Sequence, residues 1–163
     1  MSENTGLSAD ARTRIDRELA KYPADQKQSA VMAALTIVQT ENGHLTAPLM
    51  DAVAAYLGMP TIAVYEVATF YSMYDLKPIG RHKLSVCTNL PCALSGANEA
   101  ADYLQKKLCI GWNGTTPDGA VTLKEGECFG ACGDAPVILH NNKRMLTGMT
   151  PGKIDELLAE LAK

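Results

Sequence analysis

Apolar residues recur every three or four positions from the N-terminus to about residue 75, which is the spacing of amphipathic helices. The sequence there predicts four short helices with brief connections, an arrangement typical of a small bundle. The residues expected to begin or end these helices are Ser8, Pro23, Asn42-Gly43, Thr46, Gly58 and Pro60. The apolar positions of the first three are Ala11, Ile15, Leu19, Tyr22, Val31, Leu35, Val38, Leu49, Val53, Tyr56 and Leu57, and the fourth contains VYEVATFY.

The pattern changes after the Pro/Gly break DLKPIG at 75–80. The sequence HKLSVCT alternates like a strand, and residues 92–109 carry one apolar helical face. A turn-rich segment leads to two further strands, AVTLKEG and PVILHNN, and KRMLTG is the expected hairpin partner of the latter across a tight turn at Asn141-Asn142. A final helix is expected to begin at Thr150-Pro151.

The order β-α-β-β-α is that of a small mixed sheet flanked by helices. We therefore assign the fold class α/β (α+β), with an N-terminal helical bundle over residues 1–78 and a sheet-containing domain over 79–163.

Composition excludes several classes of partner. The chain has 163 residues, 47% of them hydrophobic, and a net charge of −3, which disfavours nucleic acid and anionic membranes. Residues 1–75 alone have five Lys and Arg against nine Asp and Glu. No apolar run approaches the roughly 20 residues that span a bilayer, and the start, MSENTGLSADARTRID, has no apolar core like that of a secretory signal. We expect a soluble protein without direct membrane insertion, in a compartment that keeps thiols reduced.

Four of the five cysteines form two pairs. VCTNLPCALSG places Cys87 at the end of a strand and Cys92 at the start of a helix, and GECFGACGDAP places Cys128 and Cys132 in a glycine-rich loop between later strands. An odd total argues against a disulfide framework, so a metal ion or a cluster is the better interpretation. The loop glycines let the backbone turn tightly and bring amide N–H groups close to sulfur.

Spacing alone leaves three chemistries open. Structural zinc takes four thiolates, but its common two-residue spacing is missing here. A thioredoxin-type dithiol requires C-x-x-C, which the chain lacks. A [2Fe–2S] cluster also takes four cysteines, and a four-residue gap occurs in the plant-type pattern, although the C-x-x-C that follows there is absent. The spacing therefore favours a cluster over zinc without deciding between them.

The segments TFYSMYDLKPIGRHKLSVCTNLPC and TTPDGAVTLKEGECFGACGDAP, with the C-x4-C and C-x3-C pairs about 35 residues apart, closely resemble the small, E-type thioredoxin-like [2Fe–2S] subunit of bacterial respiratory complex I. The resemblance runs from about residue 10 to the end. It implies a thioredoxin-like [2Fe–2S] ferredoxin domain, with Cys87, Cys92, Cys128 and Cys132 as the cluster ligands. A thioredoxin-like fold also makes the peptide before Pro136 a candidate for the cis form.

The resemblance implies an electron-transfer subunit in the NADH-dehydrogenase module of NADH–quinone oxidoreductase, exchanging electrons with the FMN of a partner subunit that also binds NADH. Such a complex lies on the cytoplasmic side of the inner membrane, where this subunit would be peripheral. The alternatives are the equivalent subunit of an NAD-linked hydrogenase or formate dehydrogenase and, from another class, a zinc-stabilised adaptor without redox activity.

No complete active site is expected in this chain alone. It has no G-x-G-x-x-G or phosphate-binding loop, so NADH and FMN belong on the partner, and no residue is assigned a catalytic role. A cluster held by four thiolates has no open coordination position and moves electrons. Glu127 and Asp134 add negative charge beside the cysteines, partly offset by Lys124, which predicts a low-potential centre of about −400 mV, as in plant-type ferredoxins.

The remaining candidates have less specific interpretations. Cys109 has no partner at metal spacing and is expected to be a small buried residue. His44, His82 and His140 are isolated in the sequence and are expected in surface or loop positions.

Four of the aromatic side chains fall within ten residues, at Tyr65, Phe70, Tyr71 and Tyr74. Packing in the core of the bundle is the expected role, and contact with the flavin-bearing partner is the alternative, because aromatic residues are enriched at the centres of interfaces.

Overall fold

The computed structural model describes residues 6–162, so the first five residues of the N-terminal stretch considered above lie outside the described part. The chain divides into two compact units, Met1–Pro78 and Ile79–Lys163, and each is described by itself. Among the described residues, no helix is long and apolar enough to cross a membrane.

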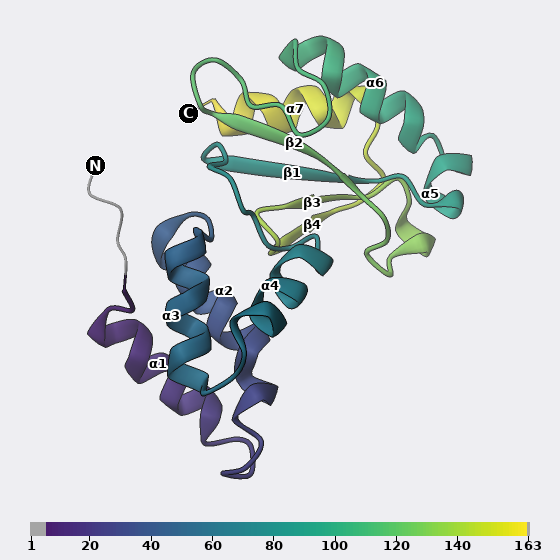
Figure 1. The fold of residues 1–163 in the computed structure, drawn as a ribbon. Coiled ribbons are helices and arrows are strands. Elements are labelled where there is room, and N and C mark those ends of the chain that lie inside the picture. The colour runs from purple at the N-terminus through teal and green to yellow at the C-terminus, as the bar shows by residue number, and fades with distance from the viewer. Residues whose placement is uncertain (1–5, 163) are drawn as a thin grey trace. The chain divides into compact units, whose positions relative to one another are not determined.

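The first unit consists of helices (Figure 1). They are α1 (Ala9–Leu19), the short 3₁₀ helix η1 (Lys27–Ala30), α2 (Val31–Asn42), α3 (Ala47–Leu57) and α4 (Thr61–Phe70). The four expected helices are confirmed, and so are most of their ends. The Ser8 side chain accepts a hydrogen bond from the N–H of Ala11 and caps α1, while Gly43 and Gly58 end α2 and α3 with φ of 82° and 66°, which suits glycine.

The core of this unit is formed by the predicted apolar stripes, with Ile15, Leu35 and Val53 fully buried. Tyr22 is the exception, because α1 ends at Leu19 and the Tyr22 side chain is exposed. The segment after α4 is tied to α2 through Gln39. Its side-chain Nε2 donates to the carbonyl of Met73, and its Oε1 accepts from the N–H of Asp75. Burial of apolar stripes and satisfaction of the connecting backbone together hold the helices in place.

The second unit contains a four-stranded mixed sheet in the order β2-β1-β3-β4. Its elements are β1 (His82–Cys87), α5 (Leu90–Leu94), α6 (Ala97–Leu108), β2 (Val121–Gly126), the 3₁₀ turn η2 (Cys132–Asp134), β3 (Ile138–His140), β4 (Arg144–Leu146) and α7 (Pro151–Leu161). β1 pairs in parallel with β2 and antiparallel with β3, which pairs antiparallel with β4. The predicted α/β class, with its small mixed sheet, is confirmed.

Figure 1 shows α6 and α7 lying on the same face of this sheet. Between helices and sheet lies an apolar core that includes Leu84, Leu104 and Ile154, all fully buried. The two helices are also joined at the surface, where the Asp155 carboxylate accepts from the Tyr103 hydroxyl at 2.8 Å and pairs with Lys107 at 3.0 Å. The predicted helix start at Thr150-Pro151 is confirmed, because the Thr150 hydroxyl accepts from the N–H of Lys153.

The prediction of a single helix over residues 92–109 is wrong. The chain forms two helices, α5 and α6, separated at Ser95-Gly96. Gly96 has a φ of 94°, a left-handed conformation that breaks the helical path between them. The hairpin turn at Asn141-Asn142 is confirmed, with φ of 50° and 57°, and the Ala135–Pro136 peptide is cis.

Two expectations about isolated residues are also wrong. Cys109 is exposed, because it ends α6 in a left-handed conformation with φ of 54° and its side chain points out of the core. His82 and His140 are not isolated: the Nδ1 of His82 lies 3.1 Å from the Nε2 of His140. They come from neighbouring antiparallel strands, so 58 positions in sequence separate two residues in contact.

Core packing, the expected role of the aromatic group, holds for only part of it. Tyr74 is buried, and its hydroxyl donates to the carbonyl of Met32 at 2.8 Å. Phe70 and Tyr71 are exposed and form an edge-to-face pair with ring centroids 5.1 Å apart. The prediction of core packing is therefore confirmed for Tyr74 and wrong for Phe70.

Candidate metal centre

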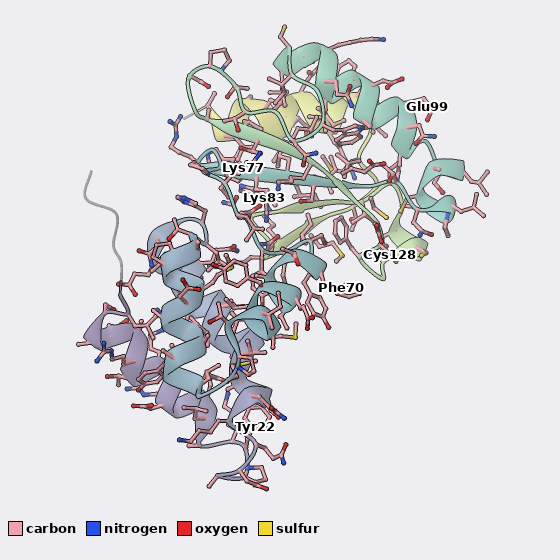
Figure 2. All side chains as sticks on the ribbon, in the orientation of Figure 1. Tyr22, Phe70, Lys77, Lys83, Glu99 and Cys128 are labelled. Carbon is pink, nitrogen blue, oxygen red and sulfur yellow. The ribbon has the colours of Figure 1, made fainter. Side chains whose placement is uncertain are left out.

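Parallel pairing brings the two cysteine-bearing loops to one end of the sheet. Cys87, the last residue of β1, lies opposite Gly126, the last residue of β2. Because parallel strands end at the same edge, the segments that follow them emerge side by side. α5, with Cys92, follows β1, and the loop with Cys128 and Cys132 follows β2; Figure 2 shows Cys128 at the α5 end of the sheet.

Cys87 and Cys92 form the inner side of the site. Both are buried, and they belong to a small apolar cluster with Ala97 and Val137. The N–H of Cys87 donates to the carbonyl of Val137 at 3.0 Å, and its Sγ lies 3.7 Å from the carbonyl oxygen of Glu127 in the second loop. Burial, and then the neighbouring Cys87 thiol, raises the pKa of the Cys92 thiol to about 11. Without a nearby positive charge, this thiol stays protonated at neutral pH.

Cys128 and Cys132 form the outer side, and both are exposed. The N–H of Gly130 points at Cys128, with 3.4 Å between nitrogen and Sγ, which confirms the expected approach of an amide to sulfur. Gly130 has a φ of 70°, and this turn directs its N–H back toward the preceding cysteine.

Gly126 is required for a different reason. The Phe129 ring packs directly over it, and a Cβ at this position would lie 2.3 Å from the ring. Phe129 was not among the predicted site residues, although an aromatic residue between two cysteines of a glycine-rich loop was a visible signal. Gly133 has open space around it, so no close approach requires a glycine there.

The four cysteines thus lie on two adjacent segments, 87–92 and 128–132, two facing the apolar cluster and two facing solvent. Both Cys87 and Cys132 lie close enough to Cys92 to raise its pKa. Over residues 6–162, no three His, Cys, Asp or Glu side chains are arranged to hold a metal ion. Four sulfur donors on two loops, with an amide directed at one sulfur, are a donor set suited to an iron–sulfur cluster.

The sequence profile of the thioredoxin-like [2Fe–2S] ferredoxins matches residues 15–162. This match covers both units and all four paired cysteines. The chain belongs to the thioredoxin-like [2Fe–2S] ferredoxin family.

The names of individual relatives are more specific than the name of the family. An E-type subunit of the NADH-quinone oxidoreductase of Rhizobium meliloti is 45% identical over 78% of this chain and 74% of its own length. The E-type subunit of the Rickettsia felis enzyme is 41% identical over 87% of this chain and 85% of its own. Subunit 2 of the Thermus thermophilus NADH-quinone oxidoreductase is 36% identical over 96% of this chain and 86% of its own.

Among solved structures, an NAD⁺-reducing [NiFe]-hydrogenase in the H₂-reduced state has the same fold, with a TM-score of 0.66 at 19% identity. The match covers 78% of this chain but only 22% of the hydrogenase chain. It supports the fold alone.

Proposed function

We propose that this chain holds one [2Fe–2S] cluster through Cys87, Cys92, Cys128 and Cys132 and carries electrons in an NADH-quinone oxidoreductase. The observation that carries the proposal is the meeting of the two cysteine-bearing loops at one end of the sheet, fixed by the pairing of Cys87 with Gly126. The names of the relatives, at 36–45% identity over most of their length, support the complex.

When bound, a [2Fe–2S] cluster would supply reversible one-electron transfer without binding substrate, since thiolates would fill its coordination positions. The residues around the cysteines have separate roles. Val137 and Ala97 exclude water from the inner cysteines, Gly130 directs its N–H at Cys128, and the exposed outer cysteines leave one side of the site open to a partner. Hydrogen bonds to sulfur and local charge set the potential, so Gly130, Glu127 and Asp134 are the groups that adjust it.

The partner in this proposal is a separate subunit that binds FMN and NADH, and the chain is peripheral, on the cytoplasmic side of the inner membrane. The residues described here contain no membrane-spanning helix, in keeping with a peripheral position. The solved hydrogenase offers a second setting for the same kind of subunit, but at 19% identity it supports the fold and gives no reason to prefer hydrogen as the electron source.

Purification of the native assembly through a tag on this chain tests the proposal. The expected result is co-purification of a flavin-containing subunit with NADH oxidation coupled to quinone reduction. Recovery of nickel and hydrogen uptake in place of quinone reduction would assign the chain to a hydrogenase. Recovery of a single colourless chain with bound zinc would replace electron transfer with the adaptor function.

A further inference from the structure

The short helix α5 carries two large apolar side chains that face solvent. Leu90 is 68% exposed and Leu94 is 81% exposed, while Cys92 between them is only 2% exposed. Leu90 and Leu94 are four positions apart, so they lie on the same side of the helix, opposite the buried cysteine. Two large apolar side chains exposed on one side of a helix form an apolar patch, and such patches can mark contact sites.

Acidic side chains lie at both ends of α5. Within residues 86–100 and 124–137, which form the cysteine end of the sheet, the acidic residues are Glu99, Glu125, Glu127 and Asp134, all exposed, and the one basic residue is Lys124. Glu125 accepts a hydrogen bond from the Thr88 hydroxyl just before α5. At the other end of α5, a Cβ on Gly96 would lie 3.7 Å from the Glu99 carboxylate.

We propose that Leu90 and Leu94, with the acidic residues at the two ends of α5, form the surface on which the redox partner docks. The inference rests on the proposed function, because an electron carrier must place its cluster close to the group with which it exchanges electrons. Cys92 lies on the buried side of the same helix turn, so a partner that covers the leucines sits directly beside the cluster ligands.

The negative charge around α5 indicates which kind of partner the surface can bind. A second copy of this chain would bring the acidic ends of one α5 against those of another, which is unfavourable at an interface. A cluster with four thiolates adds further negative charge. The surface therefore fits a different protein, one with an apolar depression for the leucines and a surrounding rim of Lys and Arg.

The test measures the affinity of the cluster-loaded chain for its FMN-binding partner subunit. Leu90→Ser and Leu94→Ser are each expected to weaken binding about tenfold or more, as for residues at the centre of an interface. Met145→Ser is the matched control, since Met145 is also an exposed apolar residue of this unit but lies on β4, away from α5. The affinity of the Met145→Ser variant for the partner subunit is expected to stay within about twofold of wild type. Affinity is also expected to fall as ionic strength rises from about 0.05 M to about 0.5 M.

Iron and sulfide content and the EPR signal of each variant are measured alongside. Unchanged affinity in both leucine variants, with the cluster intact, would overturn the docking surface and leave the proposed function standing. Self-association of the wild-type chain that is lost in Leu94→Ser would assign the surface to a second copy and likewise overturn the proposal. A wild-type chain that binds no iron and sulfide would contradict the proposed function itself.

Discussion

The five cysteines differ in their surroundings in ways that separate the four proposed ligands from Cys109. Cys87 and Cys92 are buried at the end of β1 and in α5, Cys128 and Cys132 are exposed on the facing loop, and Cys109 is exposed at the far end of α6. Only the first four lie at the same end of the sheet. This arrangement makes Cys109 the natural internal control for the other four.

Substitution of Cys87 by serine is expected to abolish or distort the cluster, because a hard oxygen replaces a thiolate ligand. Cys109→Ser is expected to leave the visible absorbance and the EPR signal of the reduced protein unchanged. The two variants differ from wild type by the same sulfur-to-oxygen change. Loss of the spectrum in Cys109→Ser with retention in Cys87→Ser would reverse the ligand assignment.

The close packing of Phe129 on Gly126 predicts a local steric effect. In Gly126→Ala, the added methyl group would meet the ring at 2.3 Å, so the ring and the loop that carries Cys128 must shift. We expect unfolding by urea to show a loss of about 1–3 kcal/mol, with reduced cluster content. Gly133→Ala has open space around its Cβ and is expected to change stability by less than about 0.5 kcal/mol. Equal losses in both variants would contradict the steric explanation.

The histidine pair makes a prediction about pH. Burial first, and then His82 and Arg144, holds the pKa of His140 below its usual value. The unfolded chain therefore binds a proton at His140 more readily than the folded chain, and stability falls as pH drops through about 6.5, the ordinary histidine pKa. His140→Asn cannot be protonated and is expected to lose less stability than wild type between about pH 7.5 and pH 5.5.

Urea unfolding at the two pH values, followed by circular dichroism, measures this difference. His44→Asn is the control, because His44 belongs to the other unit, Met1–Pro78, and is not a member of the pair. An equal loss of stability on acidification in wild type and His140→Asn would show that the pair does not contribute.

At the level of elements, the break between α5 and α6 predicts a conformational effect that is free of clashes. Gly96 has a φ of 94°, and the nearest atom to a Cβ there would be 3.7 Å away. Gly96→Ala is therefore expected to cost about 1–2 kcal/mol through the backbone alone. Gly152→Ala lies in the first turn of α7 with nothing within 4 Å, and is expected to stabilise by about 0.4–1 kcal/mol. The opposite signs in thermal unfolding test the assignment, and a neutral Gly96→Ala would contradict it.

The elements also show what the sequence could and could not predict. Helix ends with a cap or a terminal glycine, such as the start of α1 after Ser8 and the end of α3 before Gly58, follow local rules and were predicted. The end of α1 was not predicted, because the helix stops at Leu19, before the expected Tyr22. The separation of α5 from α6 was missed, because Leu94 and Ala97 continue an apolar helical pattern across the break and only the glycine conformation reveals it. The pairing of His82 with His140 was missed because strand order and register depend on tertiary structure.

At the scale of the whole molecule, the part of the candidate site that could be predicted is the spacing of its cysteines. The two cysteine pairs and their loops could be read from the sequence, and strand pairing at Cys87 and Gly126 gives the reason they lie together. The burial of Cys92, the ring of Phe129 over Gly126, and the exposed leucines of α5 required the structure. They follow from the way the protein packs, which no local pattern encodes.

The metal content of the purified protein tests the central claim most directly. Anaerobic purification followed by iron and acid-labile sulfide analysis is expected to give two irons and two sulfides per chain, in a protein that becomes EPR-active when reduced. One zinc per chain with no sulfide would contradict the account.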